Sequence, residues 1–192
     1  MPGTIIGCLG AQRSGKTLFA YKLVKAIHEA YDIPVYTNIY SPQDDFHYIN
    51  SLEDFPLDLS PKILFIDEIY NGLDAQDYKK LKEISIFINT IGKQNCLFVY
   101  TTIEAEMVYN RLRNQTQTVV VVSKNDSNIY YKLINLADMS SSIHSVPIND
   151  KLFENVYYDT QFIPLDFDWG MKDWRNKLSN FYRDNYGLIV IL

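Results

Sequence analysis

Eight residues close to the N-terminus, from Gly10 to Thr17, constrain the fold more than any other part of the chain. They match the pattern G-x-x-x-x-G-K-[ST], with which proteins hold the phosphates of a nucleoside triphosphate. The glycines let backbone N–H groups turn inward around an anion, and the helix that follows adds the positive end of its dipole. The loop consists of Gly10, Ala11, Gln12, Arg13, Ser14, Gly15, Lys16 and Thr17.

The sequence on both sides of this loop supports the motif. Residues 4–9 form a short apolar run typical of a buried strand, and residues 18–31 place apolar side chains on one helical face. A strand, a loop and a helix in this order predict an ATP site. In such a site Lys16 reaches the β- and γ-phosphates, and the hydroxyl of Thr17 is a ligand of Mg²⁺.

A second motif follows about fifty residues later. Residues 62–66 form an apolar run that ends in Asp67 and Glu68, as in a central parallel strand whose C-terminal end opens into an active site. This run resembles the Walker B strand of P-loop NTPases. By that resemblance, Asp67 holds Mg²⁺ through water and Glu68 polarises the attacking water as general base. The adjacent Asp–Glu pair favours hydrolysis over phosphoryl transfer to a metabolite.

Length and composition indicate one domain. The chain has 192 residues, 47% of them hydrophobic, which is enough for one proper core and not comfortably enough for two. We expect residues 1–136 to form the P-loop ATPase core and residues 137–192 a C-terminal extension packed on it. The net charge of -5 gives no bulk attraction to nucleic acid, so any DNA contact requires a local basic patch or a ring of subunits. Cys8 and Cys96 lie in apolar predicted strands and are interpreted as reduced core thiols.

The remaining elements follow from periodicity and turn residues. We expect a strand at 34–39, a surface insertion at 41–60 and a helix over 75–92. A further strand over 96–100 ends in Thr101 and Thr102. The predicted buried face of the 75–92 helix consists of Leu81, Ile84, Ile88 and Ile91.

After that strand, a helix is expected with Met107, Val108 and Leu112 inward and with Arg111 and Arg113 exposed. Strands at 118–123 and 128–135 flank a turn whose residues suit a hairpin. The fold class is therefore α/β: a P-loop NTPase three-layer sandwich with a mostly parallel sheet of four or five strands and an antiparallel β-hairpin at its edge. The extension is expected to begin with a flexible link at 140–142 and to contain a packing helix with Trp174, Leu178, Phe181 and Tyr182.

The order of these features resembles the HerA/FtsK superfamily of DNA-pumping ATPases, from residue 4 to about residue 160. Within it, the chain is most similar to the small viral genome-packaging ATPases and to the Zot-like proteins of filamentous phages. Besides the two motifs, the likeness rests on a Val-Tyr-Thr-Asn-Ile strand, a Thr-Thr strand end, an Arg-x-Arg helix and the closing β-hairpin. The string Tyr158-Asp159-Thr160 is also similar to one that such proteins often carry shortly after their core.

The resemblance implies two further roles at the ATP site. Ring-forming ATPases place a residue that senses the γ-phosphate at the Thr101–Thr102 strand end. The family usually has Gln after this pair, whereas this chain has Ile103, so Thr102 is the best remaining candidate. An arginine from a neighbouring subunit would complete each site. Candidates for this arginine finger are Arg111 and Arg113, with Arg13 of the phosphate loop as a third.

Partners and location also follow from the resemblance. It implies a homo-oligomeric ring that threads double-stranded DNA and contacts its phosphates rather than its bases. Possible contacts are Lys79, Lys80, Lys82 and Lys124, although such lysines more often form a solvated helix face. A partner on a capsid or a membrane is compatible with this role. We find no signal peptide and no run that could span a bilayer, so we expect a protein of the host cytoplasm, with association with the virion left open.

Two other functions remain as alternatives. Zot-like assembly or secretion ATPases normally continue through a membrane segment to a further domain, and these residues contain neither, which favours a packaging motor. A P-loop kinase would share the phosphate loop but would normally need an Arg-rich lid to clamp two phosphorylated substrates. No such lid stands out in the sequence.

Overall fold

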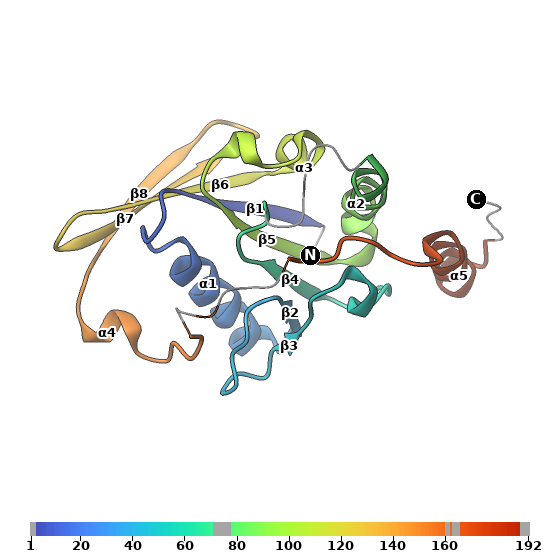
Figure 1. Ribbon diagram of the computed structural model, residues 1–192, viewed down its shortest axis with the longest axis horizontal. Coiled ribbons are helices and arrows are strands. Elements are labelled where there is room, and N and C mark those ends of the chain that lie inside the picture. Colours follow the sequence, from blue (N-terminus) through green and yellow to red (C-terminus); the bar gives the residue numbers. More distant parts are fainter. Residues whose placement is uncertain (1–2, 71–77, 160–161, 163–165, 189–192) are drawn as a thin grey trace.

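The computed structural model describes residues 3–70, 78–159, 162 and 166–188, without the side chains of 78–83 and 174. One sheet of eight strands runs through the molecule in the order β3-β2-β4-β5-β1-β6-β7-β8 (Figure 1). The strands are β1 (Thr4–Leu9), β2 (Val35–Thr37), β3 (His47–Tyr48), β4 (Lys62–Ile66), β5 (Cys96–Thr102), β6 (Thr118–Lys124), β7 (Asn128–Asn135) and β8 (Ser141–Pro147).

The sheet is parallel from β3 to β6 and antiparallel from β6 to β8. Every residue of β4 and β5 is buried, as expected for central parallel strands covered on both faces. The expected α/β fold with a mostly parallel sheet and an antiparallel edge is therefore confirmed. The parallel part holds six strands rather than four or five, because β3 and β6 both pair in parallel with their neighbours.

Helices cover both faces of the sheet and complete the three layers. The core cluster on one face includes residues of α1 and α4, and the cluster on the other includes residues of α2, α3 and α5 (Figure 1). The helices are α1 (Lys16–Tyr31), α2 (Tyr78–Thr90), α3 (Asn110–Gln115), α4 (Asp150–Phe153) and α5 (Trp174–Tyr186), with 3-10 turns η1 (Leu52–Asp54), η2 (Ile91–Gln94) and η3 (Ala105–Met107).

The predicted helix faces are mostly correct. Ile84, Ile88 and Ile91 are buried as the spacing predicted, while the Leu81 side chain and residues 75–77 lie outside the described residues. In α5, Leu178 and Phe181 are buried in the core, in agreement with a packing helix.

Three local predictions are wrong. The stretch 41–60 is more than a surface insertion, because it adds β3 to the sheet and buries Ile49, Leu52 and Phe55 in the core. Residues 141–142 of the expected flexible link are in fact the start of β8, which forms an antiparallel ladder with β7. Met107 is exposed, because its segment forms η3 and the α-helix begins only at Asn110.

Strand β8 was missed for a physical reason. Nearly all of its residues are exposed, so it carries no alternating apolar pattern, and its backbone hydrogen bonds to β7 hold it in place. The strand belongs to residues 137–192, so this extension contributes an edge strand to the sheet. Among the described residues, no helix has the length and apolar character needed to cross a membrane.

Candidate nucleotide-binding site

The phosphate loop connects β1 to α1, as the motif requires. Both of its glycines have positive φ, 153° at Gly10 and 100° at Gly15. A Cβ at Gly10 would lie 2.2 Å from the carbonyl oxygen of Val122, so only glycine fits against β6 at this point. The loop therefore packs closely against β6 and leads directly into the N-terminus of α1.

The polar side chains of the loop fit an anionic ligand. The Lys16 ammonium donates a hydrogen bond to the Ala11 carbonyl oxygen at 2.9 Å, within the loop itself. Burial lowers the Lys16 pKa, against the opposing charges of Asp67 and Glu68. The Ser14 hydroxyl is buried and finds no hydrogen-bond partner within the described chain. A buried cation and an unsatisfied hydroxyl beside a helix N-terminus are what a phosphate group would satisfy.

Asp67 lies opposite Thr17, at the end of β4. The Thr17 hydroxyl donates to Asp67 Oδ1 at 2.9 Å, and the Thr101 hydroxyl donates to the same oxygen at 2.6 Å. Burial raises the Asp67 pKa, although these two hydrogen bonds oppose the shift. A carboxylate next to a hydroxyl forms the hard oxygen donor set that Mg²⁺ prefers, so the residues present fit this ion.

The backbone around the two carboxylates is held by side chains from neighbouring strands. The Asn38 amide forms a pair of hydrogen bonds with the Asp67 backbone, accepting from its N–H at 2.8 Å and donating to its carbonyl at 3.0 Å. The Glu68 N–H donates to the Thr101 hydroxyl at 2.9 Å, and Glu68 adopts a left-handed backbone with φ of 51°. Burial, together with the charge and hydrogen bonding of Glu68, raises the Tyr70 pKa to about 12.

Thr101, rather than Thr102, therefore contacts the Asp67 carboxylate and the Glu68 backbone. Thr102 is fully buried, and its hydroxyl donates to the Glu104 carbonyl oxygen at 3.0 Å. Neither threonine lines the pocket described below. Consecutive residues of a strand point to opposite faces, so only one threonine of the pair can meet Asp67. The contact with Asp67 therefore belongs to Thr101, and the role of Thr102 as the sensor of the γ-phosphate stays a prediction.

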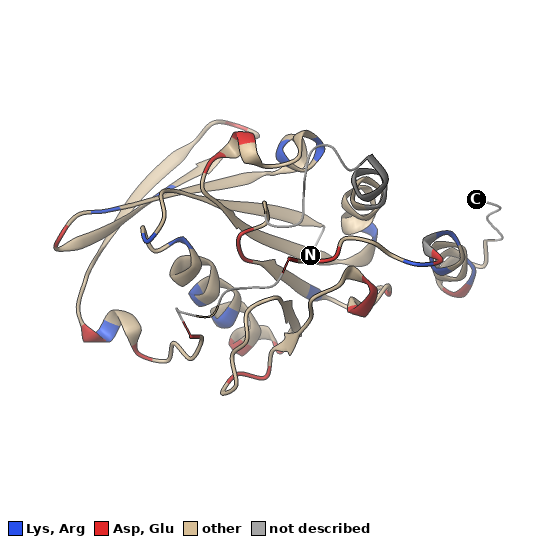
Figure 2. Cartoon of the chain, viewed as in Figure 1, with Lys and Arg blue, Asp and Glu red and all other residues tan. Residues whose placement is uncertain are grey.

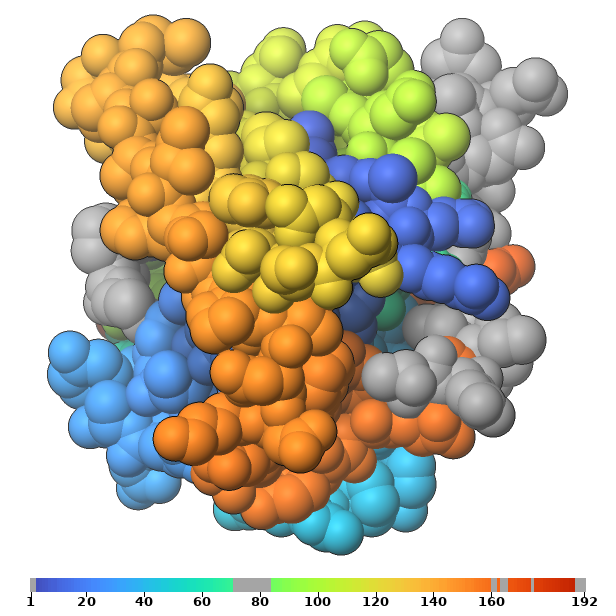
Figure 3. All heavy atoms as spheres, turned by 90° about the vertical axis from the view of Figure 1, so that its left-hand side faces the viewer, coloured from blue at the N-terminus to red at the C-terminus, as the bar shows by residue number. Residues whose placement is uncertain are grey.

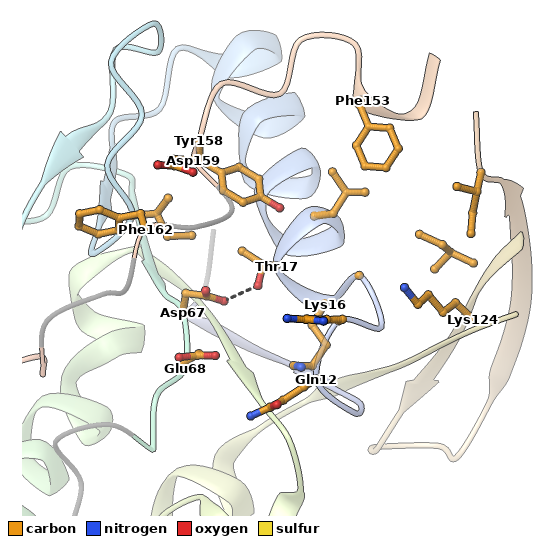
Figure 4. A pocket seen from close by; sticks show the side chains of 16 residues that line it. Gln12, Lys16, Thr17, Asp67, Glu68, Lys124, Phe153, Tyr158, Asp159 and Phe162 are labelled. Carbon is orange, nitrogen blue, oxygen red and sulfur yellow. Dashed lines mark hydrogen bonds between the residues drawn. The ribbon is translucent and has the colours of Figure 1, made fainter. Parts of the chain in front are cut away.

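A pocket of about 500 Å³ joins these groups. Its polar part contains the phosphate-loop side chains together with Asp67 and Glu68, and Figure 4 shows the carboxylates across from Thr17 and Lys16. The rest of the lining is largely apolar and includes Leu18, Ile39, Ile129, Ile148, Phe153 and Phe162, with Lys124 at the end of β6. Polar groups for phosphates and apolar surface for a base match the parts of a nucleotide.

The segment after β8 supplies residues that sequence reasoning did not assign to the site. Phe153, Tyr158, Asp159 and Phe162 all line the pocket (Figure 4). Of these residues, the sequence points only to the string at 158–160, through its resemblance and without a role, and residues 160–161 lie outside the described residues.

The basic residues considered as a finger or as DNA contacts lie in different places. Arg13 lines the pocket, whereas Arg111 and Arg113 are on α3 and do not. Arg113 donates to the Asn110 side chain at 2.7 Å, and Arg111 is exposed. Lys124 lines the nucleotide pocket. The side chains of Lys79, Lys80 and Lys82 lie outside the described residues.

Comparison with solved structures identifies the architecture. The N-terminal domain of zonular occludens toxin from Neisseria meningitidis aligns with a TM-score of 0.60 and 18% identity, over 83% of this chain and 100% of that chain. The chain has the fold of a P-loop NTPase. The genome packaging NTPase B204 from Sulfolobus turreted icosahedral virus 2, solved in complex with ATP-γS, aligns with a TM-score of 0.56 and 10% identity, over 77% and 99% of the two chains.

A third neighbour in structure is the flagellar accessory protein FlaH from Methanocaldococcus jannaschii, with a TM-score of 0.52 and 10% identity, over 70% and 78% of the two chains. No protein-family model matches the sequence, and a comparison with curated protein sequences finds no match either. The expected resemblance to Zot-like and viral packaging ATPases is thus confirmed at the level of the fold.

Proposed function

We propose that this protein is an ATP-hydrolysing motor that translocates double-stranded DNA, in the packaging of a viral genome into a capsid. The observation that carries the proposal is the meeting of the phosphate loop with Asp67 and Glu68 in one pocket, which joins a triphosphate site to a candidate general base. Packaging is supported by the likeness in fold to the genome packaging NTPase B204.

In this proposal each residue has a role that its position allows. Lys16 neutralises the β- and γ-phosphates, and Thr17 and Asp67 hold Mg²⁺, which offsets negative charge on the phosphates. Glu68 accepts a proton from the attacking water. Thr101 fixes the geometry, because its hydroxyl bonds both to Asp67 and to the Glu68 backbone.

A ring of identical subunits would complete the site. Arg111 is exposed on α3, outside its own pocket, where it is accessible to a neighbour. Figure 2 shows that α3 carries basic residues on the side of the sheet opposite α1. Replacing the finger with Ala should abolish turnover and leave ATP binding intact, since a finger in trans contributes roughly 10³ to 10⁵ in rate. Unchanged turnover in both Arg111→Ala and Arg113→Ala would remove this assignment.

A Zot-like phage assembly ATPase is the second candidate. The alignment that covers 100% of the zonular occludens toxin domain favours it. The two functions differ in their dependence on DNA, because an assembly ATPase has no need of DNA for turnover.

Steady-state ATP hydrolysis by the wild type and by Glu68→Gln, with and without double-stranded DNA at two salt concentrations, tests the proposal. We expect turnover that DNA stimulates, that salt suppresses through weaker phosphate contacts, and that the mutant lacks. Turnover that ignores DNA would reject the packaging motor in favour of the assembly ATPase. Turnover that persists in Glu68→Gln would reject Glu68 as the base.

A further inference from the structure

The segment from Asn155 to Asp159 is fastened to the side of α1. The Tyr157 N–H donates to the Tyr21 hydroxyl at 3.1 Å, and the Lys25 ammonium donates to the Asn155 carbonyl oxygen at 3.0 Å. The same ammonium lies 4.2 Å from the centre of the Tyr157 ring. In the space-filling view the residues that follow β8, in orange, run across the face next to the blue residues of α1 (Figure 3).

We call these contacts of residues 155–157 with Tyr21 and Lys25 the anchor. Asp44, in the loop after β2, stabilises the anchor. Its carboxylate accepts hydrogen bonds from Lys25 at 2.6 Å and from the hydroxyls of Tyr21 and Ser41. Only 6% of its side chain is exposed. Burial alone would raise the Asp44 pKa, but these hydrogen bonds outweigh it and lower the pKa below its usual value. A fully partnered buried carboxylate of this kind specifies one position for the groups around it.

The anchor brings Tyr158 into the nucleotide pocket. The Tyr158 ring packs 4.9 Å from the Tyr21 ring and lines the pocket, and Figure 4 shows its hydroxyl on the side of Thr17. Burial and, next, the charge of Asp67 raise the Tyr158 pKa, so the phenol stays protonated and remains a donor. Among the described residues, no hydrogen bond contributes to the environment of this hydroxyl.

We propose that Tyr158 is a nucleotide-positioning residue whose hydroxyl donates a hydrogen bond to an oxygen of the bound Mg²⁺–nucleoside triphosphate beside Thr17. Tyr21, which does not line the pocket, acts through it by holding the 155–159 segment. The inference rests on the proposed nucleotide site. It adds to that site a residue that arrives from the C-terminal part of the chain.

Isothermal titration of the full chain with ATPγS, with Mg²⁺ and with EDTA, tests the role of the hydroxyl. Tyr158→Phe removes this one group, so we expect affinity to fall about 10-fold, as for a lost hydrogen bond to a charged acceptor. Tyr157→Phe is the matched control, because among the described residues its hydroxyl bonds only to the Asn155 side chain, at 3.0 Å. A loss in both conditions assigns the acceptor to a phosphate, and a loss only with Mg²⁺ assigns it to a metal-bound water.

Two results would overturn the inference. One is Tyr158→Phe binding ATPγS as tightly as the wild type and the Tyr157→Phe control. The other is Tyr21→Phe leaving both the affinity and the hydrogen exchange of the Tyr157 amide unchanged, because this variant should weaken binding and speed that exchange. A wild type that binds no ATPγS would instead refute the nucleotide site itself, so the two failures are distinguishable.

Discussion

Replacement of Thr101 by valine tests the arrangement of the site most directly, because the side chain keeps its shape and loses only its hydroxyl. That hydroxyl donates to Asp67 at 2.6 Å, accepts from the Glu68 N–H at 2.9 Å, and is fully buried. A hydrogen bond to a charged group contributes about 1.5–3 kcal/mol, and a buried donor left without a partner costs about 1–3 kcal/mol. Since such terms overlap, we expect Thr101→Val to lower the free energy of unfolding by about 2–4 kcal/mol.

Thr102→Val is the matched control. Thr102 is equally buried, but within the part of the chain that the structure describes its hydroxyl donates only to the Glu104 carbonyl, so the expected loss is about 1 kcal/mol. For a chain of this size, 1 kcal/mol corresponds to about 2–4 °C in melting temperature. Thermal melts followed by circular dichroism should therefore separate the two variants, and ATP hydrolysis should fall in Thr101→Val alone. Equal losses of stability and activity, or a larger effect of Thr102→Val, would refute the placement of Thr101 beside the carboxylates.

Three further predictions concern charges in and around the pocket. Burial raises the Asp67 pKa above 3.8, so protonated Asp67 favours the folded state and this contribution is lost as pH rises. At pH 7.5 without Mg²⁺, Asp67→Asn should therefore have a higher melting temperature than the wild type, and it should lose Mg²⁺-dependent nucleotide binding. A lower melting temperature would contradict this. The Asp44 pKa is lowered below 3.8, so ionised Asp44 stabilises the folded state above that pH and this contribution is lost below it. The difference in melting temperature between the wild type and Asp44→Asn should therefore close on acidification. A constant difference would argue against a stabilising role of the Asp44 carboxylate. Because Lys124 lines the pocket, Lys124→Gln should weaken nucleotide binding measured by titration and leave the salt dependence of DNA binding unchanged. Unchanged nucleotide binding with a weaker salt dependence would instead indicate that Lys124 contacts DNA.

The sequence predicted the parts of the site that depend on neighbours along the chain. The phosphate loop lies between a strand and a helix, and Asp67 and Glu68 follow a buried strand, as expected. Prediction from the sequence failed where strand pairing or burial depends on residues that are distant along the chain. Strand β8 carries no apolar alternation to find, and the burial of Leu52 depends on the core that forms beneath it.

The sequence by itself determined that this chain contains a triphosphate-binding loop and a pair of carboxylates, because each motif is a local pattern whose chemistry depends on residue type and spacing. Only the tertiary structure decided which groups meet there. Side chains alternate along β5, so Thr101 and Thr102 point to opposite faces of the sheet. The Thr101 hydroxyl therefore meets Asp67, and the Thr102 hydroxyl bonds to the Glu104 carbonyl instead. Tyr158 reaches the pocket because Tyr21 and Lys25 hold its segment on α1, a contact across more than a hundred residues that no local pattern encodes.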